Sequence, residues 1–268
     1  MTPVRVCSPA RPRLVAMLAV LATVALAAPV ATAASAGASP APALRAAPAL
    51  RAGPSPSASS SSSTPAEMLG AARTAVRGEA GVVENLSLAE PAGRAAVTVH
   101  AGNGIGMDQG RFSELGKRAA VTVIDVGSVT YLRGNANGLE ASSFTSTAAA
   151  AEADKWIAIP TSSTYGKQVS DPVTIDYLAN LLRIKGTLRF TSPLTLDGQH
   201  TIGVIAATPD QTAVIYVRSS GSPLPVQVQF STSSIHETLS FSDWGTAPVL
   251  SKPSSSVPFR TSWVSLKL

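Results

Sequence analysis

Residues 100–110, HAGNGIGMDQG, contain four closely spaced glycines whose backbone amides could close around a phosphate. A dinucleotide-binding loop needs a strand before such glycines and a helix that begins directly at them. The run AAVTVHA at 95–101 has strand composition, but so do the segments that follow the glycines, GRFSEL from 110 and AAVTVIDV from 119. The pattern therefore predicts a flexible turn between neighbouring strands and no phosphate site.

Other residues with catalytic or metal-binding potential do not form a recognisable constellation. The chain has three histidines on separate predicted strands, namely His100, His200 and His236. None has a partner at metal-ligand spacing. The carboxylate pairs at 152/154 and 171/176 lie at the ends of predicted helices, where capping is the usual role of such residues. Nucleophile-elbow, H-E-x-x-H and Walker patterns are missing, so we expect a non-enzymatic protein without catalytic residues, metal or cofactor.

The first 36 residues have the pattern of a secretory signal peptide. Arginines precede the apolar run LVAMLAVLATVALAA at 14–28, and the small-residue stretch ATAASA follows Pro29. The run is about fifteen residues long, short of the roughly twenty that a membrane-spanning helix needs. We expect cleavage after Ala36, with the earlier small-x-small site at 31–33 as the alternative.

The cysteine content bears on redox chemistry and on anchoring. Cys7, the only cysteine, lies before the apolar run and would leave with the signal peptide. The mature chain is therefore expected to have neither a disulfide nor a thiol nucleophile. A lipid-bearing cysteine would have to follow the run, so we expect no lipid anchor and a protein that is secreted or retained in the cell envelope.

Residues 37–64 form an Ala/Pro/Ser-rich segment that contains APALRA twice and ends in a serine run. This composition cannot build a core and predicts a disordered, extended tether. Five of the 21 basic residues, but none of the 16 acidic ones, precede residue 65, which leaves 16 of each sign in the remainder. A neutral domain lacks the basic excess that favours nucleic acid, so no nucleic-acid partner is expected.

From residue 64 onward the pattern predicts one domain of mixed secondary structure. Thr64-Pro65-Ala66-Glu67 fits a capping box, with the helix ending near Gly78. Two further helices are expected at 135–155 and 173–182. Runs with strand composition lie at 82–88, 95–101, 110–115, 119–126, 129–134, 155–160, 186–192, 200–208, 212–220, 224–232 and 236–244. The fold class is therefore α+β: a curved antiparallel sheet, or half-barrel, of about ten or eleven strands with helices packed on its concave face.

Several segments, in this order and spacing, resemble the actinobacterial LppX/LprG-type lipoprotein family over about 65–259. They are VTYLRGNANGLEASSF, ADKWIAIPTSSTYGKQVS, VTIDYLANLL, LTLDGQHTIGVIAAT, VIYVRSSGSPLPVQVQF and LSFSDWGTAPVLSKPSSSVPF. The resemblance implies a half-barrel that encloses an apolar cavity for acyl chains, and carriage of lipids or lipoglycans across the cell envelope. The chain departs from the family in having ATAASA where a lipobox cysteine is usual. It also has an added tail at 260–268, which could be an edge strand or a frayed end.

The expected function is therefore that of a monomeric binder or carrier of an acyl-chain lipid or lipoglycan. The expected cavity lining comes from the two central helices and comprises Leu139, Phe144, Tyr177, Leu178 and Leu181. The alternative is that these residues are ordinary core, and that the protein is a structural or interaction module of the same fold with a cell-envelope protein as its partner. Each buried methylene would contribute roughly 0.8 kcal/mol to binding of an acyl chain.

Overall fold

The computed structural model describes residues 63–265, except positions 92, 115–116, 185 and 209–210. The expected signal peptide at 1–36 with its cleavage site after Ala36, nearly all of the expected tether at 37–64, and the last residues of the expected tail lie outside the described residues. Those expectations stay predictions. Within the described part of the chain, no helix is both long and apolar enough to cross a membrane.

One large sheet organises the fold. Its strands are β1 (Gly81–Glu90), β2 (Gly93–Gly102), β3 (Ile105–Glu114), β4 (Lys117–Val126), β5 (Val129–Gly134), β6 (Ile157–Pro160), β7 (Leu188–Phe190), β8 (Leu194–Leu196), β9 (Gln199–Ala207), β10 (Thr212–Arg218), β11 (Pro225–Ser231), β12 (His236–Ser242) and β13 (Val257–Pro258). Their order is β13-β6-β5-β4-β3-β2-β1-β12-β11-β10-β9-β7, with β8 paired to β9. All pairings are antiparallel except that of β13 with β6. The sheet does not close on itself, since β13 and β7 end the order.

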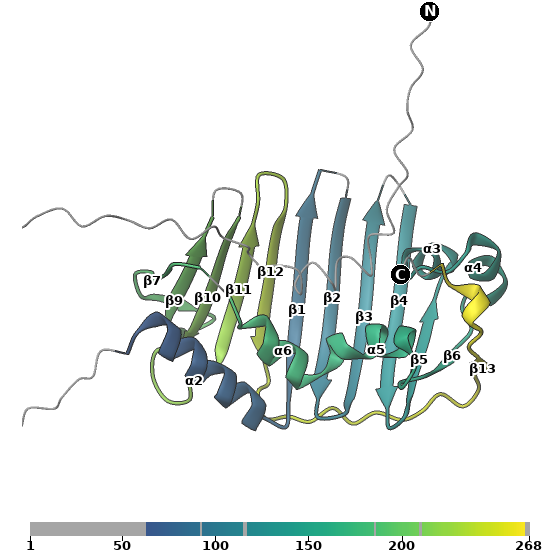
Figure 1. The fold of residues 1–268 in the computed structure, drawn as a ribbon, viewed down its shortest axis with the longest axis horizontal. Coiled ribbons are helices and arrows are strands. Elements are labelled where there is room, and N and C mark those ends of the chain that lie inside the picture. The colour runs from purple at the N-terminus through teal and green to yellow at the C-terminus, as the bar shows by residue number, and fades with distance from the viewer. Residues whose placement is uncertain (1–62, 92, 115–116, 185, 209–210, 266–268) are drawn as a thin grey trace, which may run out of the picture.

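Helices cover one face of this sheet. They are α2 (Pro65–Gly78), α3 (Ala136–Ala141), α4 (Ser146–Glu152), α5 (Thr164–Ser170), α6 (Ile175–Leu181) and the 3₁₀ turns η1 (Asp171–Val173) and η2 (Thr261–Trp263). In Figure 1, α2, α6 and α5 run across the strands, whereas α3 and α4 lie at the end of the sheet near β5. The predicted α+β half-barrel is confirmed. It has 13 strands instead of ten or eleven because short β8 and β13 carry too few residues to form a pattern.

The first helix forms for the reason that its sequence indicates. The Glu67 amide donates to Thr64 Oγ1 (3.2 Å), and the Thr64 amide donates to Glu67 Oε2 (2.7 Å), which completes the capping box. Leu69, Ala72 and Val76 are buried on the face that meets the sheet. The predicted span of this helix is confirmed.

The middle of the chain differs from the expectation of two helices. The segment expected as one helix at 135–155 is two, because Ser143 adopts a positive φ of 72° and Phe144 pairs with Val264 in an isolated bridge. Helix α5 was not expected; the Ser163 side chain caps it by accepting from the Gly166 amide (2.9 Å). The helix expected at 173–182 begins at Ile175.

The glycine-rich stretch is a hairpin turn, as predicted. Gly102 ends β2, Gly104 has a φ of 70°, and β3 begins at Ile105, so Ala101 pairs with Gly106. Strand β3 therefore starts five residues earlier than position 110 and includes two of the glycines. Gly104 supplies the positive φ that the turn needs.

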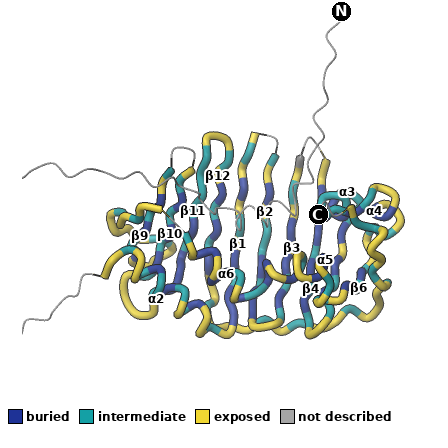
Figure 2. Tube along the Cα trace, viewed as in Figure 1, coloured by how far each residue is buried: buried dark blue, intermediate teal, exposed yellow. Residues whose placement is uncertain are grey.

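The buried residues fall into two core clusters. The first packs α2, α6 and η1 against β1, β2 and β9–β12 and includes Val76, Leu178, Leu181, Ile215 and Leu239. The second packs α3, α4 and α5 against β4, β5 and β6 and includes Val123, Leu132, Leu139, Phe144 and Tyr165. Figure 2 shows the buried positions recurring along the strands behind the helices.

Candidate functional site

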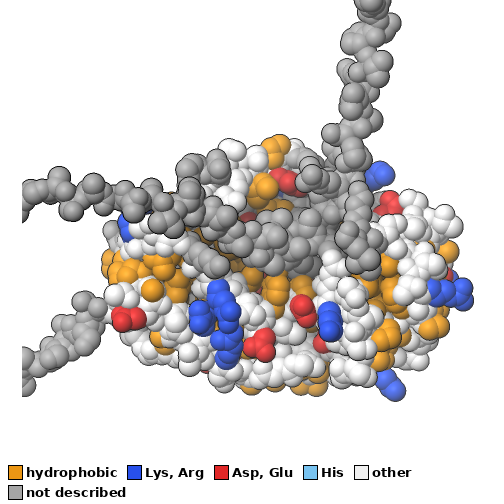
Figure 3. Space-filling view, viewed as in Figure 1, with side chains coloured by type: hydrophobic (Ala, Val, Ile, Leu, Met, Phe, Trp, Pro, Cys, Tyr) orange, Lys and Arg blue, Asp and Glu red, His pale blue; other side chains and the backbone are white. Residues whose placement is uncertain are grey.

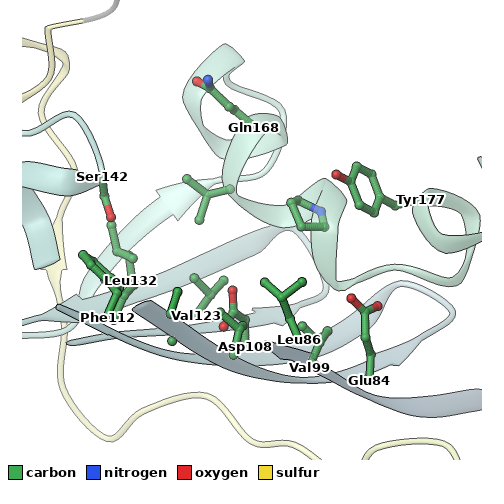
Figure 4. A pocket seen from close by; sticks show the side chains of 16 residues that line it. Glu84, Leu86, Val99, Asp108, Phe112, Val123, Leu132, Ser142, Gln168 and Tyr177 are labelled. Atoms are coloured by element: carbon green, nitrogen blue, oxygen red, sulfur yellow. The ribbon is translucent and has the colours of Figure 1, made fainter. Parts of the chain in front are cut away.

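A mostly apolar pocket lies between the middle of the sheet and the α5–η1–α6 segment (Figure 4). Its cavity volume is about 60 Å³. The sheet contributes Glu84, Leu86, Ala95, Val97, Val99, Asp108, Gly110, Phe112, Val121, Val123 and Leu132, and the opposite side contributes Ser142, Gln168, Val169, Pro172 and Tyr177. The pocket therefore joins the two core clusters, because its walls include residues of both.

Strand register places two acids on the floor of the pocket. Glu84 of β1 pairs with Val99 of β2, and Val99 pairs with Asp108 of β3. Directly paired residues share a face of a sheet, so both carboxyls lie on the helix-bearing face. They are two strands apart, which at the usual strand spacing is roughly 10 Å. Figure 4 shows both side chains rising from the sheet toward the helical segment.

A close contact between η1 and the sheet fixes the α5–η1–α6 segment, which covers the pocket and is called its roof below. A Cβ atom on Gly106 would overlap the backbone oxygen and side chain of Val173, so only glycine lets η1 approach β3 this closely. Beside this contact, Gly102 and Thr174 form an isolated parallel bridge. The side chain of Thr174 then caps α6 by accepting from the Tyr177 amide (3.2 Å). This sequence of contacts places Tyr177 over the end of the pocket that contains Glu84 (Figure 4).

The acids on this face have unusual protonation behaviour. Burial, and after it the neighbouring Asp108 and Glu237, raises the pKa of Glu84 to about 8. Burial also raises the pKa of Asp108 to about 7 and that of Glu237, on β12, to about 7. Burial and then the nearby acids raise the pKa of Tyr177. The pocket floor is thus an apolar environment in which negative charge is costly.

Two buried aspartates of neighbouring strands differ in their surroundings. Asp125 on β4 accepts from Thr130 Oγ1 (2.8 Å) and Thr161 Oγ1 (3.4 Å). Asp108 is 6% exposed, and its Oδ1 has no hydrogen-bond partner among the described residues. The buried carboxyl of Asp125 therefore receives hydrogen bonds from two threonine hydroxyls, whereas Asp108 presents an unpaired oxygen at the pocket.

The structure separates the five residues expected to line a cavity. Tyr177 lies on the pocket wall. Leu178 and Leu181 are buried in the first core cluster, and Leu139 and Phe144 in the second. Ligand contact by these five residues stays a prediction.

The buried acids on the helix-bearing face of the sheet, two of which line the pocket, were not singled out from the sequence, although a signal for them exists. Glu84, Asp108 and Glu237 each occupy an inward position of an alternating strand, in phase with residues such as Leu86, Phe112 and Leu239. An acidic residue in the apolar phase of a half-buried strand is a departure from the period-2 pattern. That departure marks all three positions.

The histidines and helix-end carboxylates remain apart from the pocket. His100, His200 and His236 lie on β2, β9 and β12. Among the described residues, no three side chains of metal-ligating type are grouped so that they could hold a metal ion. Asp176 pairs instead with Arg77 of α2 (3.2 Å) on the molecular surface, where Figure 3 shows charged side chains interspersed with hydrophobic ones.

Comparisons with known proteins give distant structural similarities. No family model and no curated protein matches the sequence. LprF from Mycobacterium bovis is 12% identical with a TM-score of 0.48, and the match covers 71% of this chain and 97% of LprF. The lipoprotein LppX of Mycobacterium tuberculosis is 15% identical with a TM-score of 0.43, over 70% of this chain and 99% of LppX.

A third similarity is to the MucA/MucB complex of Pseudomonas aeruginosa, at 14% identity and a TM-score of 0.38, over 69% of this chain and 58% of the matched chain. Membership of the LppX/LprG-type family therefore stays a prediction from the sequence.

Proposed function

We propose that this protein is an exported, non-enzymatic binder or carrier of amphipathic lipids. The apolar pocket between sheet and helices is the observation that carries the proposal. Ligand pockets in proteins are typically apolar clefts with a few polar groups, and this pocket has aliphatic walls with a small set of polar side chains. Its apolar lining would shield an acyl chain from water.

Binding of a whole acyl chain requires the pocket to enlarge. Its volume of about 60 Å³ is well below the roughly 300–1,000 Å³ that is usual for small-molecule sites. The segment that would move is α5–η1–α6, because it provides every residue on that side of the cavity except Ser142. A chain of ten methylenes would contribute roughly 8 kcal/mol from burial, which can offset the cost of separating these layers.

The small volume also favours a second candidate, a structural or protein-interaction module in which the same fold keeps a nearly filled cavity. This protein would bind a cell-envelope partner through its surface and take up no lipid. The two candidates differ in one measurable property, which is uptake of an acyl chain into the pocket.

Gly110 offers a specific test. A Cβ atom at this position would lie 3.7 Å from Val97 Cγ2, in ordinary contact, and a longer side chain would extend into the pocket. We expect the purified protein to take up a fluorescent twelve-carbon fatty-acyl probe and to release lipid on extraction with organic solvent. Gly110→Leu should abolish uptake, whereas Gln109→Leu, exposed on the opposite face of β3, should not. If the extract contains no lipid and the protein takes up no probe, the proposal is wrong.

A further inference from the structure

The pocket floor contains an acidic centre with no visible counter-charge. Glu84 and Asp108 lie in one row across β1–β3, and none of the 16 residues that line the pocket is a lysine, arginine or histidine. The remaining lining residues are apolar except for Ser142, Gln168 and Tyr177. Two carboxyls in such surroundings repel each other and lack solvation.

Asp108 indicates that this centre is incomplete. Its side chain is more than nine-tenths buried, faces the cavity, and has an oxygen without a partner among the described residues. An unsatisfied buried acceptor destabilises the folded protein, and more so when it is charged. A ligand that donates a hydrogen bond to Asp108 Oδ1 would remove this destabilisation, and a cationic donor would also reduce the repulsion between the two acids.

We propose that the pocket selects amphiphiles whose head group is a protonated amine that donates to Asp108, with the charge of Glu84 two strands away adding to the attraction, while the acyl chain lies along the apolar side chains from Leu86 and Val97 toward Phe112. This inference deepens the proposed function and depends on it. A metal ion fits this centre less well than a protonated amine does, because the described residues provide no group of three metal-ligating side chains. An anionic head group would add a third negative charge to the same floor.

The pH dependence of binding follows from the groups that face the centre. These are Glu84 on β1, Asp108 on β3, Glu237 on β12 and Tyr177 on α6. The exposed Asp171 on η1 acts on Tyr177 and on Asp125 of β4, and neither aspartate lines the pocket. The pKa values of Glu84 and Asp108, about 8 and about 7, mean that both carboxyls lose their protons between pH 6 and pH 9. An alkylamine, with a pKa near that of lysine at about 10, stays protonated over most of this range. Amine affinity should therefore rise with pH, and carboxylate affinity should fall.

The experiment compares three ligands of equal chain length, dodecylamine, dodecanol and dodecanoate, by calorimetry on the full-length protein at pH 6 and pH 8. We expect dodecylamine to bind at least about tenfold more tightly than dodecanoate at pH 8, which corresponds to about 1.4 kcal/mol, because a hydrogen bond to a charged group is stronger than one between neutral groups. Asp108→Asn should remove this preference, and Glu84→Gln should reduce it. Asp197→Asn, in the exposed turn between β8 and β9, is the matched control and should retain it.

The outcomes distinguish the two proposals. If dodecanol or dodecanoate binds as tightly as the amine, or if Asp108→Asn and Glu84→Gln both retain the preference, the head-group inference is wrong and lipid binding stands. If none of the three ligands binds, lipid binding itself is wrong. Thermal melts of each variant establish that a lost preference does not reflect an unfolded chain.

Discussion

At the scale of single residues, the buried carboxyls are the most informative feature of the molecule. A soluble domain places acids inside its core rarely, because charge there is poorly solvated. Asp125 is buried together with two threonine hydroxyls that donate to it. Asp108 has no such arrangement at Oδ1 among the described residues. This difference between two aspartates on adjacent strands suggests that Asp108 serves something other than the stability of the free protein.

A dependence of stability on pH follows from these residues. A carboxyl with a raised folded-state pKa holds its proton longer in the folded protein than in the unfolded chain. For Glu84 and Asp108, the ordinary values are 4.5 and 3.8, and the folded values are about 8 and about 7. The loss of folding stability that comes from ionising these two buried carboxyls is therefore absent below about pH 4 and fully present above about pH 8. We expect the free energy of unfolding, measured by urea denaturation, to fall across this interval.

The variant Asp108→Asn isolates one of these groups. It cannot ionise, so its urea midpoint should fall less steeply between pH 5 and pH 8, and at pH 8 it should be more stable than the natural protein by on the order of 1–3 kcal/mol. Asp197→Asn, at an exposed turn, should leave the slope unchanged. Parallel curves for Asp108→Asn and the natural protein would show that Asp108 stays solvated or paired in solution.

At the scale of elements, the contact of η1 with β3 sets how closely the α5–η1–α6 segment packs against the sheet. Gly106→Ala would place a methyl group against the Val173 backbone, which cannot retreat without moving η1. We expect a loss of about 1–3 kcal/mol, the usual cost of overpacking. Gly110→Ala, four residues along the same strand and face, meets its nearest atom only at 3.7 Å and should change stability by less than about 1 kcal/mol. Equal midpoints for both variants in urea would contradict this account of the roof.

The C-terminal segment contributes to the core more than its sequence indicates. The rings of Phe144 and Trp263 have centroids 6.4 Å apart, Trp263 also contacts Phe259, and the Trp263 carbonyl accepts from the Thr145 amide (2.8 Å). We expect Trp263→Ala to lower the free energy of unfolding by about 1–3 kcal/mol. Phe190→Ala, at a residue of β7 that is 37% exposed, is the control and should cost less. A midpoint that does not change for Trp263→Ala would mean that this segment is frayed in solution.

Secondary structure was predicted well from the sequence where it depends on neighbouring residues. It was predicted poorly where it depends on a contact with residues far away along the chain. Strand β5 at 129–134 has its predicted bounds, because alternation and the Gly127 turn are both local signals. The break at Ser143 and Phe144 was not predictable, because the bridge partner Val264 lies more than a hundred residues away. The pocket was expected between the helices and the sheet, but its walls consist mainly of strand residues. Which strand residues face the pocket depends on the register of the strands, and the sequence alone does not give this register.

At the scale of the whole molecule, the pocket lies where the two core clusters meet. Val99 belongs to the first cluster, Val123 and Leu132 to the second, and all three line the cavity. The helices divide in the same way, with α2 and α6 over one part of the sheet and α3 and α4 at the other, and with α5 and η1 between them (Figure 1). A ligand in the pocket would therefore contact both halves of the core and should stabilise them together.

This arrangement predicts a single, ligand-dependent thermal transition. A ligand at a hundred times its dissociation constant stabilises the folded state by about 2.7 kcal/mol, which for a domain of this size raises Tm by about 5–10 °C. We expect that shift with the amphiphile that binds most tightly, and slower hydrogen exchange both in β1 and β2 and in β4 and β5. Gly110→Leu should show no shift, because its side chain occupies the same space. Protection confined to one half would mean that the ligand lies outside the pocket, since the walls of this cavity include residues of both clusters.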